Sequence, residues 1–135
     1  MPKLYRSREG TITAVDTKTQ LSTLGSESAP GPLLVPSQAK SLKAIIFCCA
    51  TTMAVAADGS MLVRLEGPGL PEGPEVVAVG SAGVAVATGG HGSNGAYRLE
   101  LDIPVVASNE ILVFAENVGE DLGEVTVGVT LEFLL

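Results

Sequence analysis

The chain has 135 residues, of which 46% are apolar and only 17% are charged, and its formal net charge is −7 at pH 7. This length suits a single domain whose core needs no metal or disulfide staple. No apolar run reaches the roughly 20 residues of a membrane helix, and the basic start lacks the apolar run of a secretory signal. We therefore expect no membrane partner and no export by a signal peptide.

The first 40 residues are expected to form an extended N-terminal arm with one candidate strand, Thr11–Thr17. The Pro-, Gly- and Ser-rich stretch Ser22–Pro32 that follows is typical of a loop. Up to Lys43 the chain has six basic and three acidic residues, whereas from Ala44 onward it has two basic and twelve acidic ones. This asymmetry predicts a basic arm on an acidic body.

Residues 41–135 are expected to form the body, an antiparallel β-sandwich of about eight strands when the arm's strand is included. The segments 43–52, 61–66, 76–79, 84–87, 97–103, 110–116 and 124–135 have strand-like patterns. Turns are predicted at 57–60 and 80–83 and in the Gly-rich stretch 88–95. A jelly roll is the favoured topology, and an immunoglobulin-like sandwich is the second choice because its buried Trp and paired Cys are absent.

The last strand has the clearest pattern. Its five apolar residues alternate with polar ones, so they should lie on one face, toward the core: Val125, Val127, Val129, Leu131 and Phe133. Leu134 and Leu135 break the alternation, and only one of them can face that core. The other is predicted to contact a partner.

Residues that could support catalysis are few. His91 lies among glycines, where nothing would hold its ring in place, and no nucleophile elbow or phosphate-binding loop occurs. Cys48 and Cys49 match no zinc pattern and are expected to be small buried residues in a reducing compartment. We therefore predict a protein that is not an enzyme and needs no cofactor.

Two charged clusters remain as candidate sites. An acidic turn could form a weak calcium site, although its residues lack the spacing of a known calcium loop: Glu116, Glu120, Asp121 and Glu124. The arm contributes a basic cluster of interaction residues: Lys3, Tyr5, Arg6 and Arg8. The acidic body would repel nucleic acid, so docking onto an acidic neighbour is the preferred role of this cluster.

The acidic, Val- and Ala-rich body with a basic arm resembles small viral and phage structural proteins, namely capsid decoration (cement) proteins and single-jelly-roll coat proteins. The resemblance rests on the arm Met1–Pro36, the Val/Ala-rich strands and the terminal strand Val125–Leu135. It implies a virion protein assembled in the host cytoplasm. It also implies a homo-oligomer, with a trimer favoured, that binds a major capsid protein.

The alternative is a carbohydrate-binding β-sandwich module of a virion or cell surface. Such modules usually present a platform of aromatic side chains to the sugar. Tyr5 and Tyr97 are the only tyrosines, and the chain has no Trp. This scarcity weighs against the alternative.

Overall fold

The computed structural model describes residues 2–13, 16–23, 31–51, 57–85, 92–119 and 124–135. These residues form no helix, and their strands make two antiparallel sheets, so the protein is all-β as predicted. The strands are β1 (Lys3–Ile12), β2 (Thr19–Gln20), β3 (Ser22–Thr23), β4 (Leu33–Leu34), β5 (Ser41–Thr51), β6 (Ala57–Glu66), β7 (Glu75–Ala85), β8 (Gly92–Pro104), β9 (Glu110–Gly119) and β10 (Val125–Leu134). None of the described segments is a helix able to span a lipid bilayer.

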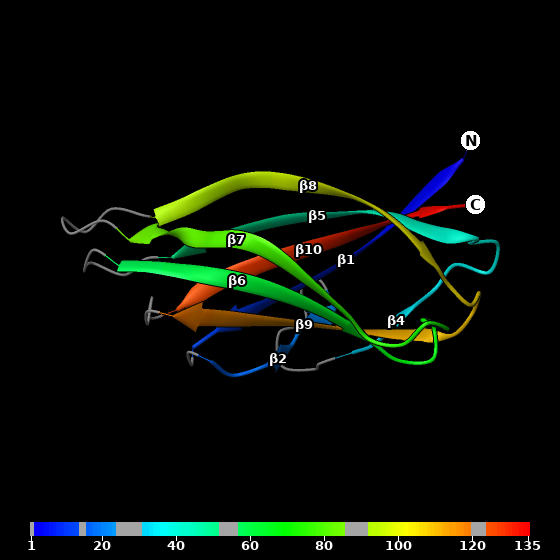
Figure 1. Ribbon diagram of the computed structural model, residues 1–135, viewed down its shortest axis with the longest axis horizontal. Helices are drawn as coiled ribbons and strands as arrows, with labels where there is room; N and C mark the ends of the chain where they lie inside the picture. Colours follow the sequence, from blue (N-terminus) through cyan, green and yellow to red (C-terminus); the bar gives the residue numbers. More distant parts are fainter. Residues whose placement is uncertain (1, 14–15, 24–30, 52–56, 86–91, 120–123) are drawn as a thin grey trace.

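Sheet A has the strand order β3-β1-β10-β5-β8, and sheet B has the order β2-β9-β6-β7, with β4 paired to β9. The first and last long strands, β1 and β10, are paired over their whole length, from Lys3 opposite Leu134 to Ile12 opposite Val125. Figure 1 shows the consequence, because the N- and C-terminal ends of the chain lie together at one end of the molecule.

The core consists of apolar side chains from both sheets, which form one hydrophobic cluster. The five alternating residues of β10 are each at most 1% exposed, which confirms their predicted burial. The same cluster contains Ile45 and Phe47 of β5, and Val113 of β9. β-Branched and aromatic residues fit a pleated surface that is covered on one side. A slip of β10 by one residue would turn its apolar side chains away from the core, so the alternation of apolar and polar residues fixes the register of this strand.

The segment expected to form an arm is largely part of the sheets and the core. The strand expected at Thr11–Thr17 instead spans Lys3–Ile12. Five apolar side chains of the described part of the first 40 residues are buried with the rest of the core: Ile12, Leu21, Leu33, Val35 and Ala39. The described part of residues 1–40 therefore packs with the remaining chain instead of extending from it.

Three further expectations need correction. The predicted strand 76–79 and the described part of the predicted strand 84–87 belong to one strand, β7, which runs through Gly80 and Gly83, whereas residues 86–87 lie outside the described residues. The turn expected at 57–60 lies inside β6. Part of the Gly-rich stretch 88–95 belongs to β8, which begins at Gly92.

Cys48 is exposed, so the expectation of a buried residue is wrong for this cysteine. The residue opposite it on β10 is Gly128, which has no side chain to cover the sulfur.

Candidate functional site

The most unusual polar group of the described chain is the carboxylate of Glu132 in β10. It lies on the polar face of its strand, yet its side chain is only 1% exposed. Three donors from two other strands surround it. Lys3 Nζ lies 3.0 Å from Oε1, the Tyr5 hydroxyl donates to Oε1 over 3.1 Å, and Arg98 Nη2 donates to Oε2. Buried charges in proteins are normally paired in this way.

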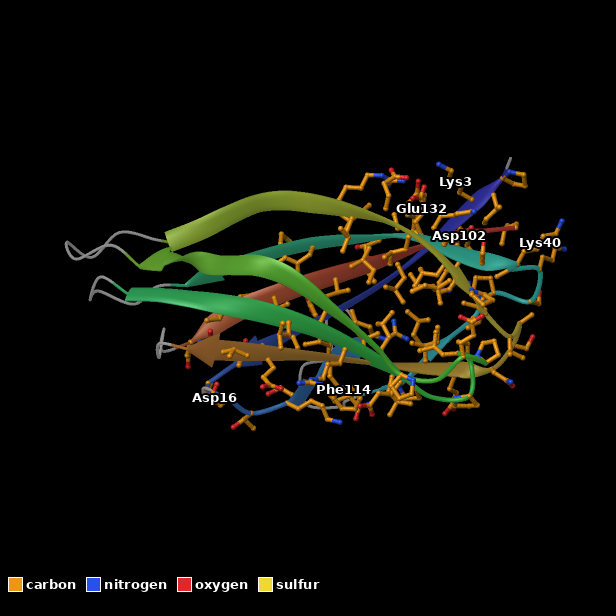
Figure 2. The ribbon with its side chains drawn as sticks, in the orientation of Figure 1. Lys3, Asp16, Lys40, Asp102, Phe114 and Glu132 are labelled. Carbon is orange, nitrogen blue, oxygen red and sulfur yellow. The ribbon has the colours of Figure 1, made fainter. Side chains whose placement is uncertain are left out.

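Backbone register explains how these residues meet. In sheet A, Tyr5, Glu132, Ala44 and Glu100 form one row across β1, β10, β5 and β8. Arg98 lies two residues before Glu100, on the same face of β8 and opposite Ile46 of β5. Its guanidinium reaches across β5 to Glu132. The β5 residue of the row that contains Glu132 is Ala44, whose side chain is a single methyl group and is fully buried. Figure 2 shows Lys3 beside Glu132 at the end of the molecule where the chain termini lie.

The surrounding charges keep Glu132 ionised. The hydrogen bond from Lys3 is the main cause that holds the pKa of Glu132 below its ordinary value, and those from Arg98 and Tyr5 act in the same direction. Burial alone would raise this pKa, but the donors outweigh it. Hydrogen bonds to Glu100 and then to Glu132 raise the pKa of Arg98. An ionised carboxylate that is covered by three donors is suited to joining strands.

The charges continue beyond Glu132 along the same face. Arg98 Nε lies 3.0 Å from Oε1 of Glu100, and Lys43 Nζ lies 2.9 Å from Oδ1 of Asp102. On the other side of Tyr5, the hydroxyls of Ser7 and Thr130 share a hydrogen bond of 2.8 Å. Polar contacts therefore link β1 and β10, the first and last long strands along the chain, to β8, which lies at one end of the order of sheet A.

The predicted basic cluster is divided between the two faces of β1. Lys3 and Tyr5 contact Glu132, whereas Arg6 and Arg8 lie opposite the inward residues Leu131 and Val129. Arg6 donates to the carbonyl oxygen of Tyr5 over 3.3 Å. Alternation along a strand accounts for this separation, since neighbouring side chains point to opposite faces.

Arg8 binds backbone carbonyls. Its guanidinium donates to the carbonyl oxygens of Gly31 and Pro32, over 3.3 Å and 3.0 Å, and to that of Ser7 over 2.7 Å. Burial, followed by the charge of Arg6, lowers the pKa of Arg8. Arg8 thereby attaches β1 to the segment that leads into β4.

Of the predicted terminal pair, Leu135 packs against the core, and Leu134 lies on the same face of β10 as Glu132. Both side chains are half-buried.

The predicted calcium site is only partly described. Arg64 Nε lies 3.3 Å from Oε1 of Glu116, and Glu124 is exposed and immediately precedes β10. Glu120, Asp121 and His91 lie outside the described residues. Within the described residues, no group of three or more His, Cys, Asp or Glu side chains could hold a metal ion.

Sequence reasoning missed Glu132 as a site residue. Its partners come from β1 and β8, which are far away in the chain, so no local motif marks it. The available signal was a carboxylate placed between Leu131 and Phe133 near the end of an apolar strand. No protein-family model and no curated protein matches the sequence, so the functional argument rests on geometry.

Proposed function

We propose that this protein is a non-enzymatic structural subunit of a virion, a capsid decoration (cement) or minor capsid protein that acts as a homo-oligomer. The observation from which the proposal starts is the strand order, which narrows the fold before the polar site is considered. β2, β3 and β4 have two residues each; when β3 and β4 are set aside and β2 is kept, the remaining eight strands, numbered along the chain, have the orders 1-8-3-6 and 2-7-4-5 in the two sheets.

These orders support a jelly roll built from two antiparallel sheets, the finer form of the fold proposed here. In a Greek key, a strand returns by a long connection to lie beside the first of its group. The eighth strand here lies beside the first, and the seventh beside the second. Jelly rolls occur in viral capsid proteins and also in lectins and cupins, so the fold alone does not select a function.

The polar site favours the structural role within that group. Glu132 is covered by three donors and is held as an anion, so it has neither the access nor the raised pKa that a general acid requires. Its position suits mechanical coupling, because it joins three strands of one sheet. A subunit of a shell under internal pressure needs strand edges that resist separation.

The N-terminal segment has a different role from that of an arm draped over a neighbour. Lys3 and Tyr5 are bound to Glu132 of the same chain. Contacts with further copies, with a trimer favoured, and with a major capsid protein then come from the outer surfaces and edges of the sheets.

Sedimentation velocity over a wide concentration range tests the proposal. A stable trimer or other closed oligomer is the expected result. A strict monomer that binds sugars on a glycan array would overturn the proposal in favour of a carbohydrate-binding module.

A further inference from the structure

Among the described residues, sheet A has unpaired backbone positions along β8 and along the first half of β1. No described strand pairs with the second edge of β8, and β3 pairs with β1 only at Arg8 and Glu9, so no described strand lies beside Lys3–Ser7 on that side. In Figure 1, β8 and β1 lie at opposite margins of this sheet. Unpaired backbone groups on an edge strand are a template for pairing with another chain.

The two edges carry opposite charges. Across the sheet, the ionic groups alternate in the order Lys3, Glu132, Arg98 and Glu100, and each contacts the next. This series of charges therefore begins with a cation on β1 and ends with an anion on β8. The terminal side chains are accessible, since Lys3 is 45% exposed and Glu100 is 79% exposed. Asp102, also on β8, is 77% exposed and adds to the acidic edge.

The strand directions permit the sheet to continue into another copy. Each neighbouring pair among β1, β10, β5 and β8 is antiparallel, so β8 runs opposite to β1. A β8 placed against the open edge of β1 in a second copy would extend the antiparallel ladder. If the rows of residues stay aligned, Tyr5 would lie beside Glu100 of that copy. Lys3, two residues from Tyr5 on the same face of β1, would then follow Glu100 in the series of alternating charges.

We propose that copies of this chain associate head to tail through sheet A, with the β1 edge of one copy paired to the β8 edge of the next. This inference rests on the self-association in the proposed function and names its surface. A head-to-tail contact closes into a ring when its rotation permits and otherwise gives a filament.

The charges also select which edges meet. Two β1 edges would bring together strands that each carry the exposed cation Lys3, and two β8 edges would bring together strands that each carry the exposed anions Glu100 and Asp102. Like charges placed together disfavour such symmetric pairs, whereas β1 against β8 is attractive. Charged residues on an edge strand usually protect it from pairing. Here their opposite signs direct the pairing to one partner.

Cross-linking provides a direct test. A carbodiimide joins a lysine to a carboxylate only when they touch. Within one copy, Lys3 and Glu100 lie on strands separated by three strand spacings, roughly 14 Å. A Lys3–Glu100 linked peptide, found by mass spectrometry in the oligomer fraction, therefore reports contact between copies. An oligomer that yields no such peptide would count against the edge pairing.

Charge reversal gives the quantitative test. Glu100→Lys should raise the dissociation constant of the oligomer by at least about tenfold, measured by sedimentation velocity. Glu72→Lys makes the same charge change at an exposed loop position and should leave it unchanged. Glu100→Gln should have a smaller effect, and raised salt should weaken the wild-type oligomer because exposed charges are screened. Thermal melts by circular dichroism establish that each variant is folded.

The outcomes separate the two proposals. A wild-type oligomer that Glu100→Lys and salt leave intact overturns the edge pairing but keeps the self-association. A monomeric wild-type protein overturns both.

Discussion

The Lys3 ammonium lies 3.0 Å from Oε1 of Glu132, so an ion pair joins the first long strand of the protein to its last. The pair is one part of a network in which Tyr5 and Arg98 also donate to the same carboxylate. Because the four side chains come from three strands, changes at Glu132 should be felt across sheet A.

Replacement of Glu132 with Gln should lower the free energy of unfolding by about 1–3 kcal/mol, since the amide keeps the shape but loses the charge that its donors require. Urea unfolding followed by circular dichroism measures the change. Glu124→Gln is the matched control because Glu124 is exposed and immediately precedes the same strand. Equal stabilities of the two variants would contradict a stabilising role for Glu132.

The contribution of Glu132 should depend on pH. Its folded-state pKa is lowered, so the unfolded state, with an ordinary value of about 4.3, binds a proton first as the pH falls. The stabilisation is therefore complete above that value and is lost as the pH falls through the folded-state pKa. Urea unfolding of the wild type and Glu132→Gln should differ by a constant amount at pH 6–7, and this difference should shrink below about pH 4. A difference that is unchanged at pH 3 would refute the assignment.

Arg98 and Glu132 should be energetically coupled. A double-mutant cycle with Arg98→Met and Glu132→Gln should give a measurable interaction energy, as found for residues in one ionic network. Arg64→Met is the control for Arg98→Met, because Arg64 contacts Glu116 in sheet B. Its effect should add to that of Glu132→Gln. Additivity in both cycles would show that the contact between Arg98 and Glu132 contributes no stability.

The two faces of β10 should respond differently to truncation. Leu131→Ala should cost about 2–5 kcal/mol because Leu131 is fully buried in the core. Thr126→Ala removes an exposed side chain from the same strand and should cost less than about 1 kcal/mol. Chemical unfolding of both variants measures the contrast, and similar costs would mean that β10 is not covered on one side only.

Deletion of residues 2–13 should abolish cooperative folding. It removes the strand that pairs with β10 over ten positions, and it also removes the Lys3 and Tyr5 partners of Glu132. Lys3→Met, which keeps the strand, should still unfold cooperatively. Circular dichroism during heating distinguishes the two. A truncated protein with an intact sharp transition would favour a separate arm.

The sequence predicted those parts of the fold in which local pattern and tertiary burial agree. The alternation of Val125–Phe133 is enough to identify β10 and the side that faces the core. It is not enough for β1, whose inward positions include Arg6, Arg8 and Gly10. That strand is defined by backbone pairing with β10, a contact between distant segments that leaves no local pattern.

The candidate site was hidden for a related reason. Glu132 occupies a position that alternation assigns to solvent, and it is buried only because Lys3, Tyr5 and Arg98 come from other strands. Burial that arises in this way depends on topology, so the position of one residue in its own strand does not reveal it.

The pairing of β1 with β10 also determines when the protein can fold. β1 leaves the ribosome long before β10, the strand that pairs with it over its whole length, because the segments between them are synthesised first. Contacts between such distant segments slow folding, because a long loop must close before any of them forms. The edge of β1 that pairs with β10 therefore stays without its partner strand until the segments between the two have been synthesised.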